Sequence, residues 1–450
     1  MGKLFGTDGI RGQANTHPVI PEIALQLGKA IAHVFEATGH GSKRVVIGKD
    51  TRLSGYMLET ALTSGLVSMG MDVFLVGPVP TPAVAHLTKS MAATAGIMLT
   101  ASHNPYDDNG IKIFDQDGFK LSDETEVLIE SYVPDGHLKN DHIRTANLGK
   151  AYRIEDARGR YIEFAKSTAD NHRLEGLRIV LDCANGAAYR IGPWIFEELG
   201  ADVIKANTHP DGYNINQDCG ALHPENVAGR VAEEQADLGI AFDGDADRVI
   251  FTDDRGNVID GDRILAMCAR DLHARGDLKD DTLVVTTMSN LGLHKAMNAA
   301  GIKVVTTAVG DRYVIDEMRR HNYNLGGEKS GHVILMDHAT TGDGIITALQ
   351  VLRLMKESGK SIRVLAQCMD EYPQKLVSIR VTEKRPLEEL PGVQKTLKAC
   401  EEDLQDRGRA VLRYSGTEPK LRLLVEAREQ PDVDKWTERL TNTIQTELGA

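Results

Sequence analysis

The strongest constraint on the fold is an alternation between short apolar runs and segments whose apolar residues recur at helical spacing. In residues 21–39 this spacing is that of an amphipathic helix, and its members are Ile23, Leu27, Ile31 and Val34. Short apolar runs follow at 45–47, 73–76 and 95–99, separated by further helical segments. The pattern predicts a parallel β-sheet covered by helices.

The alternation returns twice before the pattern changes near the C-terminus. A second round begins at 178–181 and a third at 283–286, while the chain from 376 on reads as strand, long helix, two strands and a terminal helix. The 450 residues exceed the usual domain length of roughly 100–200 residues. We expect three α/β domains over 1–150, 151–253 and 254–370, and a smaller α+β domain over 371–450.

The charge balance limits the partners. The chain has 65 acidic against 52 basic residues and a net charge of −13, so its average field repels nucleic acid and anionic membranes. We therefore expect no nucleic-acid and no membrane partner. A phosphorylated ligand must be captured locally by arginines, backbone N–H groups or a cation.

Cysteine usage indicates the compartment. The five cysteines are scattered without a C-x-x-C pair, which argues against a disulfide framework or a zinc site. No apolar run approaches the roughly 18–20 residues of a membrane span. These features predict a soluble, cytoplasmic protein.

In parallel sheets, loops at the carboxyl ends of strands form the ligand crevice. The first such loop, 100–105 (TASHNP), follows an apolar strand and offers Ser102 as a nucleophile, with Lys112 shortly after it. There is no G-x-S-x-G motif, so a hydrolase elbow is not supported. The alternative is that Ser102 is a turn residue bonded to its own backbone and Lys112 a solvated surface lysine.

A second loop, 243–248 (DGDADR), places three carboxylates at alternate positions, where they can converge on a hard cation such as Mg²⁺. An EF-hand is excluded because Arg248 and Asp254 replace the required Gly and Glu. A phosphatase-type aspartyl nucleophile would have Thr or Val in place of Asp247. The remaining alternative is a solvated acidic turn.

Two further loops carry short polar groups. In 326–332 (GGEKSGH), Glu328 and Ser330 could bond sugar hydroxyls, although such a turn on its own is weak evidence. In 413–419 (RYSGTEP), backbone N–H groups and hydroxyls flanked by Arg413 and Arg422 would form a phosphate cradle. The alternative there is a hairpin turn with exposed arginines.

In this order and at these separations, the four loops resemble those of the α-D-phosphohexomutase superfamily. The resemblance spans the chain and includes 6–12 (GTDGIRG) and 48–52 (GKDTR), while 288–292 (MSNLG), 309–313 (VGDRY) and 340–344 (TTGDG) are most similar to its phosphoglucosamine mutase branch. It implies three α/β domains with mixed sheets and a smaller, flexible α+β domain around a central cleft.

The resemblance also implies a role for each matched residue. Ser102 would carry the transferable phosphoryl group and, with Asp243, Asp245 and Asp247, hold one Mg²⁺. Around the reacting phosphate, as charge stabilisers and proton-transfer partners, would stand Arg11, Lys112, Arg248 and His332. The sugar hydroxyls would contact Glu328 and Ser330, and the phosphate that does not react would contact Arg413, Ser415, Gly416, Thr417 and Arg422.

The implied activity is interconversion of glucosamine 6-phosphate and glucosamine 1-phosphate through phosphorylated Ser102 and a glucosamine 1,6-bisphosphate intermediate, feeding UDP-N-acetylglucosamine and cell-wall synthesis. The alternatives are a phosphomannomutase or phosphoglucomutase, an aspartyl phosphatase using Asp243, and a sensor that binds sugar phosphates without turnover. A homodimer and the route that first phosphorylates Ser102 are left open.

Two positions depart from the superfamily pattern. Ala246 replaces a common glycine and mildly tightens the metal loop. Lys329 puts a cation where a neutral residue is frequent, which is harmless if the segment is extended, because Lys329 then points opposite to Glu328 and Ser330.

Overall fold

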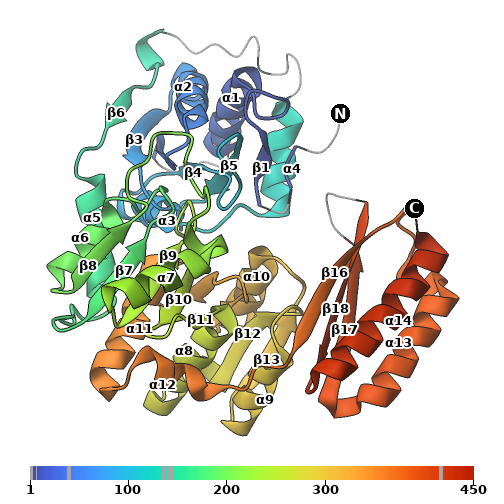
Figure 1. Ribbon diagram of the computed structural model, residues 1–450. Coiled ribbons are helices and arrows are strands. Elements are labelled where there is room, and N and C mark those ends of the chain that lie inside the picture. The colour runs from blue at the N-terminus through green and yellow to red at the C-terminus, as the bar shows by residue number, and fades with distance from the viewer. Residues whose placement is uncertain are drawn as a thin grey trace.

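The structure is a computed structural model that describes residues 4–6, 8–37, 42–133, 138, 145–414 and 419–449. Figure 1 shows three helix-covered sheets in sequence order and a fourth, smaller sheet set to one side. The expected fold class, three α/β domains with mixed sheets and a C-terminal α+β domain, is confirmed. The domain boundaries at 150, 253 and 370 stay predictions.

The first sheet has six strands in the order β1-β5-β4-β2-β3-β6. Strands β2, β3, β4 and β6 run parallel, while β5 is antiparallel to both β4 and β1. Its strands are β1 (Ile10–Gln13), β2 (Arg44–Lys49), β3 (Asp72–Pro78), β4 (Ala95–Leu99), β5 (Asp108–Phe114) and β6 (Ala151–Arg153). Its helices are α1 (Pro21–Ala37), α2 (Ser54–Ser68), α3 (Thr81–Ser90) and α4 (Asp123–Tyr132).

The second sheet has five strands in the order β11-β10-β9-β7-β8, with β7, β8 and β9 parallel and β10 antiparallel to β9 and β11. Its strands are β7 (Arg178–Asp182), β8 (Asp202–Ala206), β9 (Leu238–Phe242), β10 (Val249–Asp253) and β11 (Val258–Ile259). The accompanying helices are α5 (Ala157–Ser167), α6 (Ile191–Glu198) and α7 (Pro224–Glu234).

The third sheet has four strands in the order β13-β12-β14-β15, of which only β15 pairs antiparallel. Its strands are β12 (Thr282–Thr286), β13 (Lys303–Thr307), β14 (Leu325–Gly327) and β15 (Val333–Leu335). Its helices are α8 (Gly261–Arg275), α9 (Leu291–Ala299), α10 (Asp311–His321), α11 (Gly344–Ser358) and α12 (Ile362–Leu365).

The last sheet is antiparallel, in the order β16-β18-β17, and carries two helices. These elements are β16 (Gln374–Arg380), α13 (Pro391–Leu404), β17 (Gly408–Tyr414), β18 (Lys420–Ala427) and α14 (Gln430–Leu448). Short 3₁₀ turns lie at Thr145–Asn147, Gly220–Leu222, Lys279–Asp281, Ala366–Cys368, Leu387–Glu389 and Gln405–Arg407.

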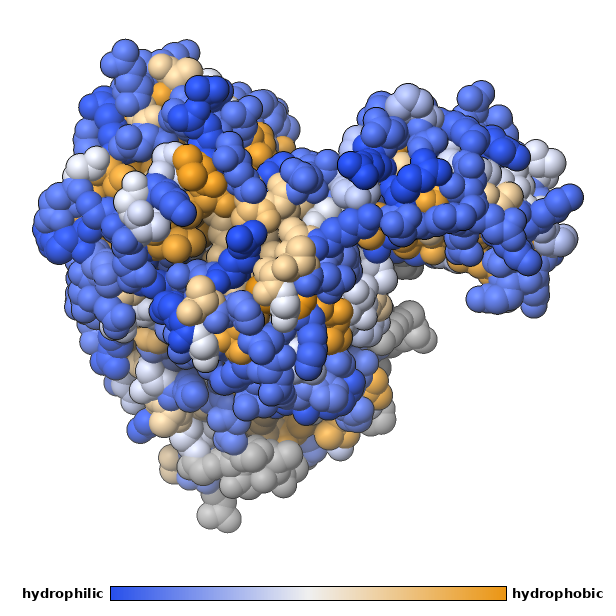
Figure 2. Space-filling model, turned by 90° about the horizontal axis from the view of Figure 1, so that it is seen from below, coloured by the Kyte–Doolittle hydropathy of each residue, from blue (hydrophilic) through white to orange (hydrophobic). Residues whose placement is uncertain are grey.

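The buried apolar side chains form a cluster shared by the three α/β domains and a separate cluster in the C-terminal domain. One cluster runs from Val84 on α3 through Phe242 on β9 to Leu349 on α11, so the three α/β domains share packed surface. A separate cluster that contains Leu423 and Trp436 forms the core of the C-terminal domain. Figure 2, seen from below, shows that domain as a lobe standing out from a mainly hydrophilic body. No helix in the described part of the chain is long and apolar enough to cross a membrane.

Candidate active site

Ser102 lies in the loop that follows β4, with its side chain turned into the protein. Its backbone has φ 51°, a left-handed conformation that costs a non-glycine residue roughly 1–2 kcal/mol. Neighbouring side chains hold the loop in place: Arg52 Nη2 and Asn216 Nδ2 donate to the Ser102 carbonyl at 3.0 and 2.8 Å. The hydroxyl donates to Asp243 Oδ2 at 2.6 Å. The loop therefore aims Oγ at the second domain.

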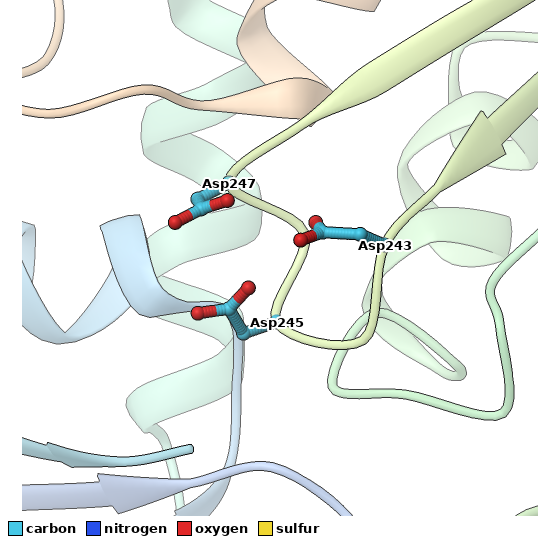
Figure 3. A group of neighbouring side chains, drawn as sticks. All are labelled: Asp243, Asp245 and Asp247. Carbon is cyan, nitrogen blue, oxygen red and sulfur yellow. The ribbon is translucent and has the colours of Figure 1, made fainter. Parts of the chain in front are cut away.

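The three predicted metal-ligating aspartates lie in the turn between β9 and β10 (Figure 3). One carboxylate oxygen from each of Asp243, Asp245 and Asp247 lies within 4.8 Å of the others, and all three residues are buried. Asp245 Oδ1 and Asp247 Oδ1 have no hydrogen-bond partner among the described residues. Buried carboxylate oxygens left unpaired are costly, and oxygen ligands suit a hard divalent cation. The residues present therefore fit a metal such as Mg²⁺.

Charge and burial shift the pKa values of the aspartates of this turn in different directions. Burial, followed by the charges of Asp247 and Asp245, raises the pKa of Asp243 well above its usual value. Burial also acts to raise the pKa of Asp247, but Lys112 and His332 outweigh it and hold that pKa well below its usual value. The pKa values of the two carboxyls are therefore shifted in opposite directions, as expected for like charges that share a buried site.

Lys112 on β5 is a buried cation that lies against the aspartates of this turn. Its Nζ donates to Asp245 Oδ2 at 3.0 Å and to Asp247 Oδ2 at 3.2 Å, and the residue is 2% exposed. Burial opposes its charge, but Asp245, Asp8 and Asp247 raise its pKa well above the usual value. Lys112 is therefore a buried positive charge against Asp245 and Asp247, not the solvated surface lysine of the alternative interpretation.

His332 and Arg248 complete the charge pattern around the aspartates. His332 Nδ1 lies 3.6 Å from Asp247 Oδ1. Burial lowers the pKa of the ring, but Asp247, Asp311 and Glu328 together raise it above its usual value. The Gly342 N–H points at Nε2 at 3.2 Å, a contact that only the neutral ring accepts. Arg248 donates its backbone N–H to Asp243 Oδ1 at 3.1 Å. The two influences on His332 oppose each other, which suits a group that gains and loses a proton.

Residues from all four predicted domains line one cleft of about 760 Å³. The first two domains contribute Asp8, Arg11, Asp247 and Arg248, and the other two contribute Glu328, His332, Arg413 and Arg422. This volume is within the range typical of small-molecule sites. The predicted central cleft is thus present, and it brings together residues that lie hundreds of positions apart in the sequence.

Comparisons with known proteins decide the family. Four domain families match in order: "Phosphoglucomutase/phosphomannomutase, alpha/beta/alpha domain I" at 2–139, domain II at 159–256, domain III at 260–372 and the C-terminal domain at 376–443. A phosphoglucosamine mutase of Geobacter sp. (strain M21) is 54% identical over all of this chain and 99% of its own. One of Myxococcus xanthus is 53% identical over 99% of this chain and 98% of its own. The chain belongs to the phosphoglucosamine mutase family.

Solved structures agree with this family at the level of the fold. A phosphoglucomutase/phosphomannomutase family protein from Burkholderia thailandensis has a TM-score of 0.82 at 23% identity, covering 99% of this chain and 97% of its own. An Aspergillus fumigatus N-acetylphosphoglucosamine mutase, solved with GlcNAc-6P and magnesium, has a TM-score of 0.68 at 18% identity, covering 99% of this chain and 96% of its own.

In this member of the phosphoglucosamine mutase family the glycine-rich loop 326–332 faces the cleft through Glu328. Glu328 Oε1 accepts from the Gly310 N–H at 3.1 Å, and Ser330 Oγ donates to Glu328 Oε2 at 3.4 Å. The segment is not extended, because residues 329–330 form a turn. Lys329 nevertheless avoids the cleft, since its Nζ lies 3.3 Å from Asp260 and 3.4 Å from Glu371 in the linker to the last domain.

Arg413 on β17 and Arg422 on β18 face each other as register partners across the last sheet. The Nε atoms of both are buried and unpaired among the described residues, and burial followed by the Arg422 charge lowers the pKa of Arg413. Two facing guanidinium groups favour binding an anion between them. The other predicted cradle residues, Ser415, Gly416 and Thr417, lie outside the described residues.

Three charged residues of the site were missed in the sequence: Asp8, Lys120 and Asp311. Asp8 bonds to Arg11 and Lys120, and Lys120 bonds to Asp311 in the third domain. Asp8 and Asp311 belong to segments that resemble the family, 6–12 and 309–313, but spacing alone gave them no role. The only sign in the sequence that Asp8 and Asp311 belong to the site was their place in those two segments.

Proposed function

We propose that this chain interconverts glucosamine 6-phosphate and glucosamine 1-phosphate, with Ser102 carrying the phosphoryl group. The decisive observation is the 2.6 Å contact from Ser102 Oγ to Asp243, next to a loop that forms part of a cleft lined by residues of all four predicted domains. Full-length relatives named phosphoglucosamine mutase support the same activity. The substrate class also agrees with the phosphosugar complex of the Aspergillus neighbour.

In the first half-reaction a sugar hydroxyl attacks the phosphorus of phosphorylated Ser102. The new sugar O–P bond forms as the Oγ–P bond breaks, and the proton lost by the sugar hydroxyl is balanced by the proton regained at Oγ. The product is glucosamine 1,6-bisphosphate. Phosphoryl transfer needs alignment and charge neutralisation more than further covalent help, and the buried loop around Ser102 provides the alignment.

We assign Mg²⁺, one per chain, to Asp243, Asp245 and Asp247 together with the phosphorylated Ser102. When bound, the ion supplies positive charge that stabilises the phosphoryl oxygens. Asp245 Oδ1 and Asp247 Oδ1, which accept no hydrogen bond from the described residues, support this assignment. The magnesium in the Aspergillus structure is consistent with it.

Protein cations supply the remaining positive charge. Arg11, Arg248 and His332 line the cleft, and Lys112 lies beneath it against the aspartates. We propose that these four groups contact the transferring phosphoryl oxygens, and that His332 also exchanges a proton with the reacting sugar oxygen. Glu328 and Ser330, which are bonded to each other, would orient the sugar hydroxyls.

In the second half-reaction the bisphosphate turns over and its other phosphate returns to Ser102. The phosphate that is not reacting must be held meanwhile, and Arg413 and Arg422 lie in the same cleft as the reacting groups. We propose that this pair, with Ser415, Gly416 and Thr417, grips the 6-phosphate in one half-reaction and the 1-phosphate in the other.

The setting follows from the chemistry. The product would feed UDP-N-acetylglucosamine and cell-wall synthesis, the pathway role of the family. All five cysteines are free thiols, which supports the expected cytoplasmic location. A homodimer stays a proposal.

Turnover tests the proposal. The enzyme, charged with glucosamine 1,6-bisphosphate, is assayed on the 6-phosphates of glucosamine, mannose and glucose, with Ser102→Ala as the inactive control. We expect the highest kcat/KM for glucosamine 6-phosphate and no turnover by the variant. A higher kcat/KM for mannose or glucose phosphate would assign the chain to the rival mutases instead.

A further inference from the structure

The turn between β13 and α10 connects the sugar loop with the first domain. On one side the Gly310 N–H donates to Glu328 Oε1 at 3.1 Å. On the other side, Asp311 pairs with Lys120 and Arg312 pairs with Asp123 and Glu126, all of which belong to the first domain. In Figure 1, α10 begins where the third domain approaches the first. Three ion pairs from two adjacent residues thus bridge the same two domains.

The Asp311–Lys120 pair differs from its neighbour because Asp311 contacts His332 directly and Lys120 is connected through Asp8 to Arg11 and Lys112. Asp311 Oδ2 lies 3.5 Å from His332 Nε2. Lys120 also bonds to Asp8, whose other carboxylate oxygen bonds to Arg11 and lies 3.4 Å from Lys112 Nζ. The pair therefore lies between the proton-transfer group of one domain and the phosphate-binding cations of another.

Burial strengthens the ion pair between Lys120 and Asp311. The side chains of Lys120 and Asp311 are 9% and 13% exposed, so solvent screens their attraction weakly. Burial opposes the charge of Lys120, yet Asp311 and Asp8 raise its pKa above the usual value. Lys120 thus remains a cation between two carboxylates, and neither carboxylate can shift without leaving it partly unpaired.

We propose that Lys120 and Asp311 are positioning residues, whose ion pair between the first and third domains sets the distance between the serine-bearing domain and the sugar loop. This ion pair makes His332 face the same phosphoryl group as Arg11 and Lys112, which lie on the other side. The inference rests on the proposed function, because it assumes that these three groups act on one transferring phosphate. Misplacement of reacting groups by about 1 Å can cost roughly 100-fold in rate.

Arg312 provides a matched control. It bridges the same two domains from the next position in the chain, with Nη2 2.8 Å from Glu126 Oε1. It does not line the cleft, whereas Asp311 does. A bridge that only stabilises the domain interface should make the two positions equivalent, and a positioning role should separate them.

The experiment compares Asp311→Asn, Lys120→Met and Arg312→Met with the wild type, all full-length and phosphorylated at Ser102. We expect Asp311→Asn and Lys120→Met to lower kcat by roughly 10- to 100-fold with KM changed by less than about threefold. Arg312→Met should lower Tm while keeping kcat within about twofold of the wild type. The double variant Lys120→Met/Asp311→Asn should lose no more than the worse single variant, because the two act as one unit.

Other outcomes would overturn the inference. These are an equal loss of kcat in Arg312→Met, an unchanged kcat in Asp311→Asn, or additive losses in the double variant. Asp311→Glu keeps the charge and should recover part of kcat, so it covers the case in which Asp311→Asn fails to fold; no recovery in a folded Asp311→Glu would also count against the proposal. Failure of the wild type itself to convert glucosamine phosphates would be a failure of the proposed function, and is distinguishable for that reason.

Discussion

Replacing Arg422 by Ala should weaken the binding of both monophosphates. Arg413 and Arg422 face each other across β17 and β18, and their Nε atoms are unpaired among the described residues. A phosphate placed between them gains a charge-assisted hydrogen bond from each, and the loss of one costs roughly 1.5–3 kcal/mol. That corresponds to a roughly 10- to 150-fold weaker Kd.

Although Arg422→Ala should weaken ligand binding, it should leave the stability of the ligand-free enzyme unchanged or raise it slightly. Without ligand the two guanidinium groups repel each other, so removing one relieves repulsion and Tm should stay equal or rise slightly. Arg428→Ala, at an exposed position of the same domain, is the matched control and should leave ligand affinity unchanged.

Calorimetric titration with glucosamine 6-phosphate and glucosamine 1-phosphate measures Kd, and kcat/KM is measured in both directions with equally phosphorylated enzyme. The contact is lost in the transition state too, so both directions should slow. A defect confined to one monophosphate would refute the shared cradle. Unchanged Kd and kcat/KM in Arg422→Ala would favour the alternative interpretation, in which the loop between β17 and β18 is an exposed hairpin turn.

Three further outcomes are expected. Chelation by EDTA should abolish turnover and Mg²⁺ should restore it, because Asp243, Asp245 and Asp247 fit an oxygen-liganded cation; full activity in metal-free buffer would contradict this. Ala246 has φ 56°, so Ala246→Val should lower Tm and weaken Mg²⁺ binding, while Ala246→Gly should keep stability within about 1 kcal/mol; equal melting curves for the two variants would refute the reasoning. Burial raises the pKa of Asp262 from 3.8 to about 7, so the contribution of this carboxyl to stability is full below pH 3.8 and is lost as pH rises through 7. The Tm of Asp262→Asn should therefore rise relative to that of the wild type between pH 5 and 8. Parallel profiles of Tm against pH for the two proteins would contradict this.

The sequence predicted best those elements whose signal is local. The run at 95–99 is a strand with the predicted bounds, because continuous apolar residues between polar loops leave a buried strand as the simplest solution. The helix predicted to end near Gly39 ends at Ala37, within the usual uncertainty of helix ends. Placement of site loops at strand ends followed from the same logic.

What the sequence could not provide depends on contacts between distant residues. Lys120 and Asp311 are 191 positions apart, and nothing in the spacing of either indicates the other. Arg52, in segment 48–52, had no role predicted for it, yet it is fully buried and bonds to the Ser102 carbonyl. The extended segment proposed for Lys329 was not found, because the Glu328 carbonyl accepts from the Gly331 N–H at 3.1 Å and closes a turn.

The identity of the phosphorylated residue tests the central claim most directly. The enzyme is incubated with glucosamine 1,6-bisphosphate carrying labelled phosphate, mapped by phosphopeptide analysis, and then chased with unlabelled glucosamine 6-phosphate. The account predicts an acid-stable label on Ser102 that moves to the sugar at a rate no slower than kcat. An acid-labile label on Asp243, or a Ser102 label that the substrate does not remove, would contradict it.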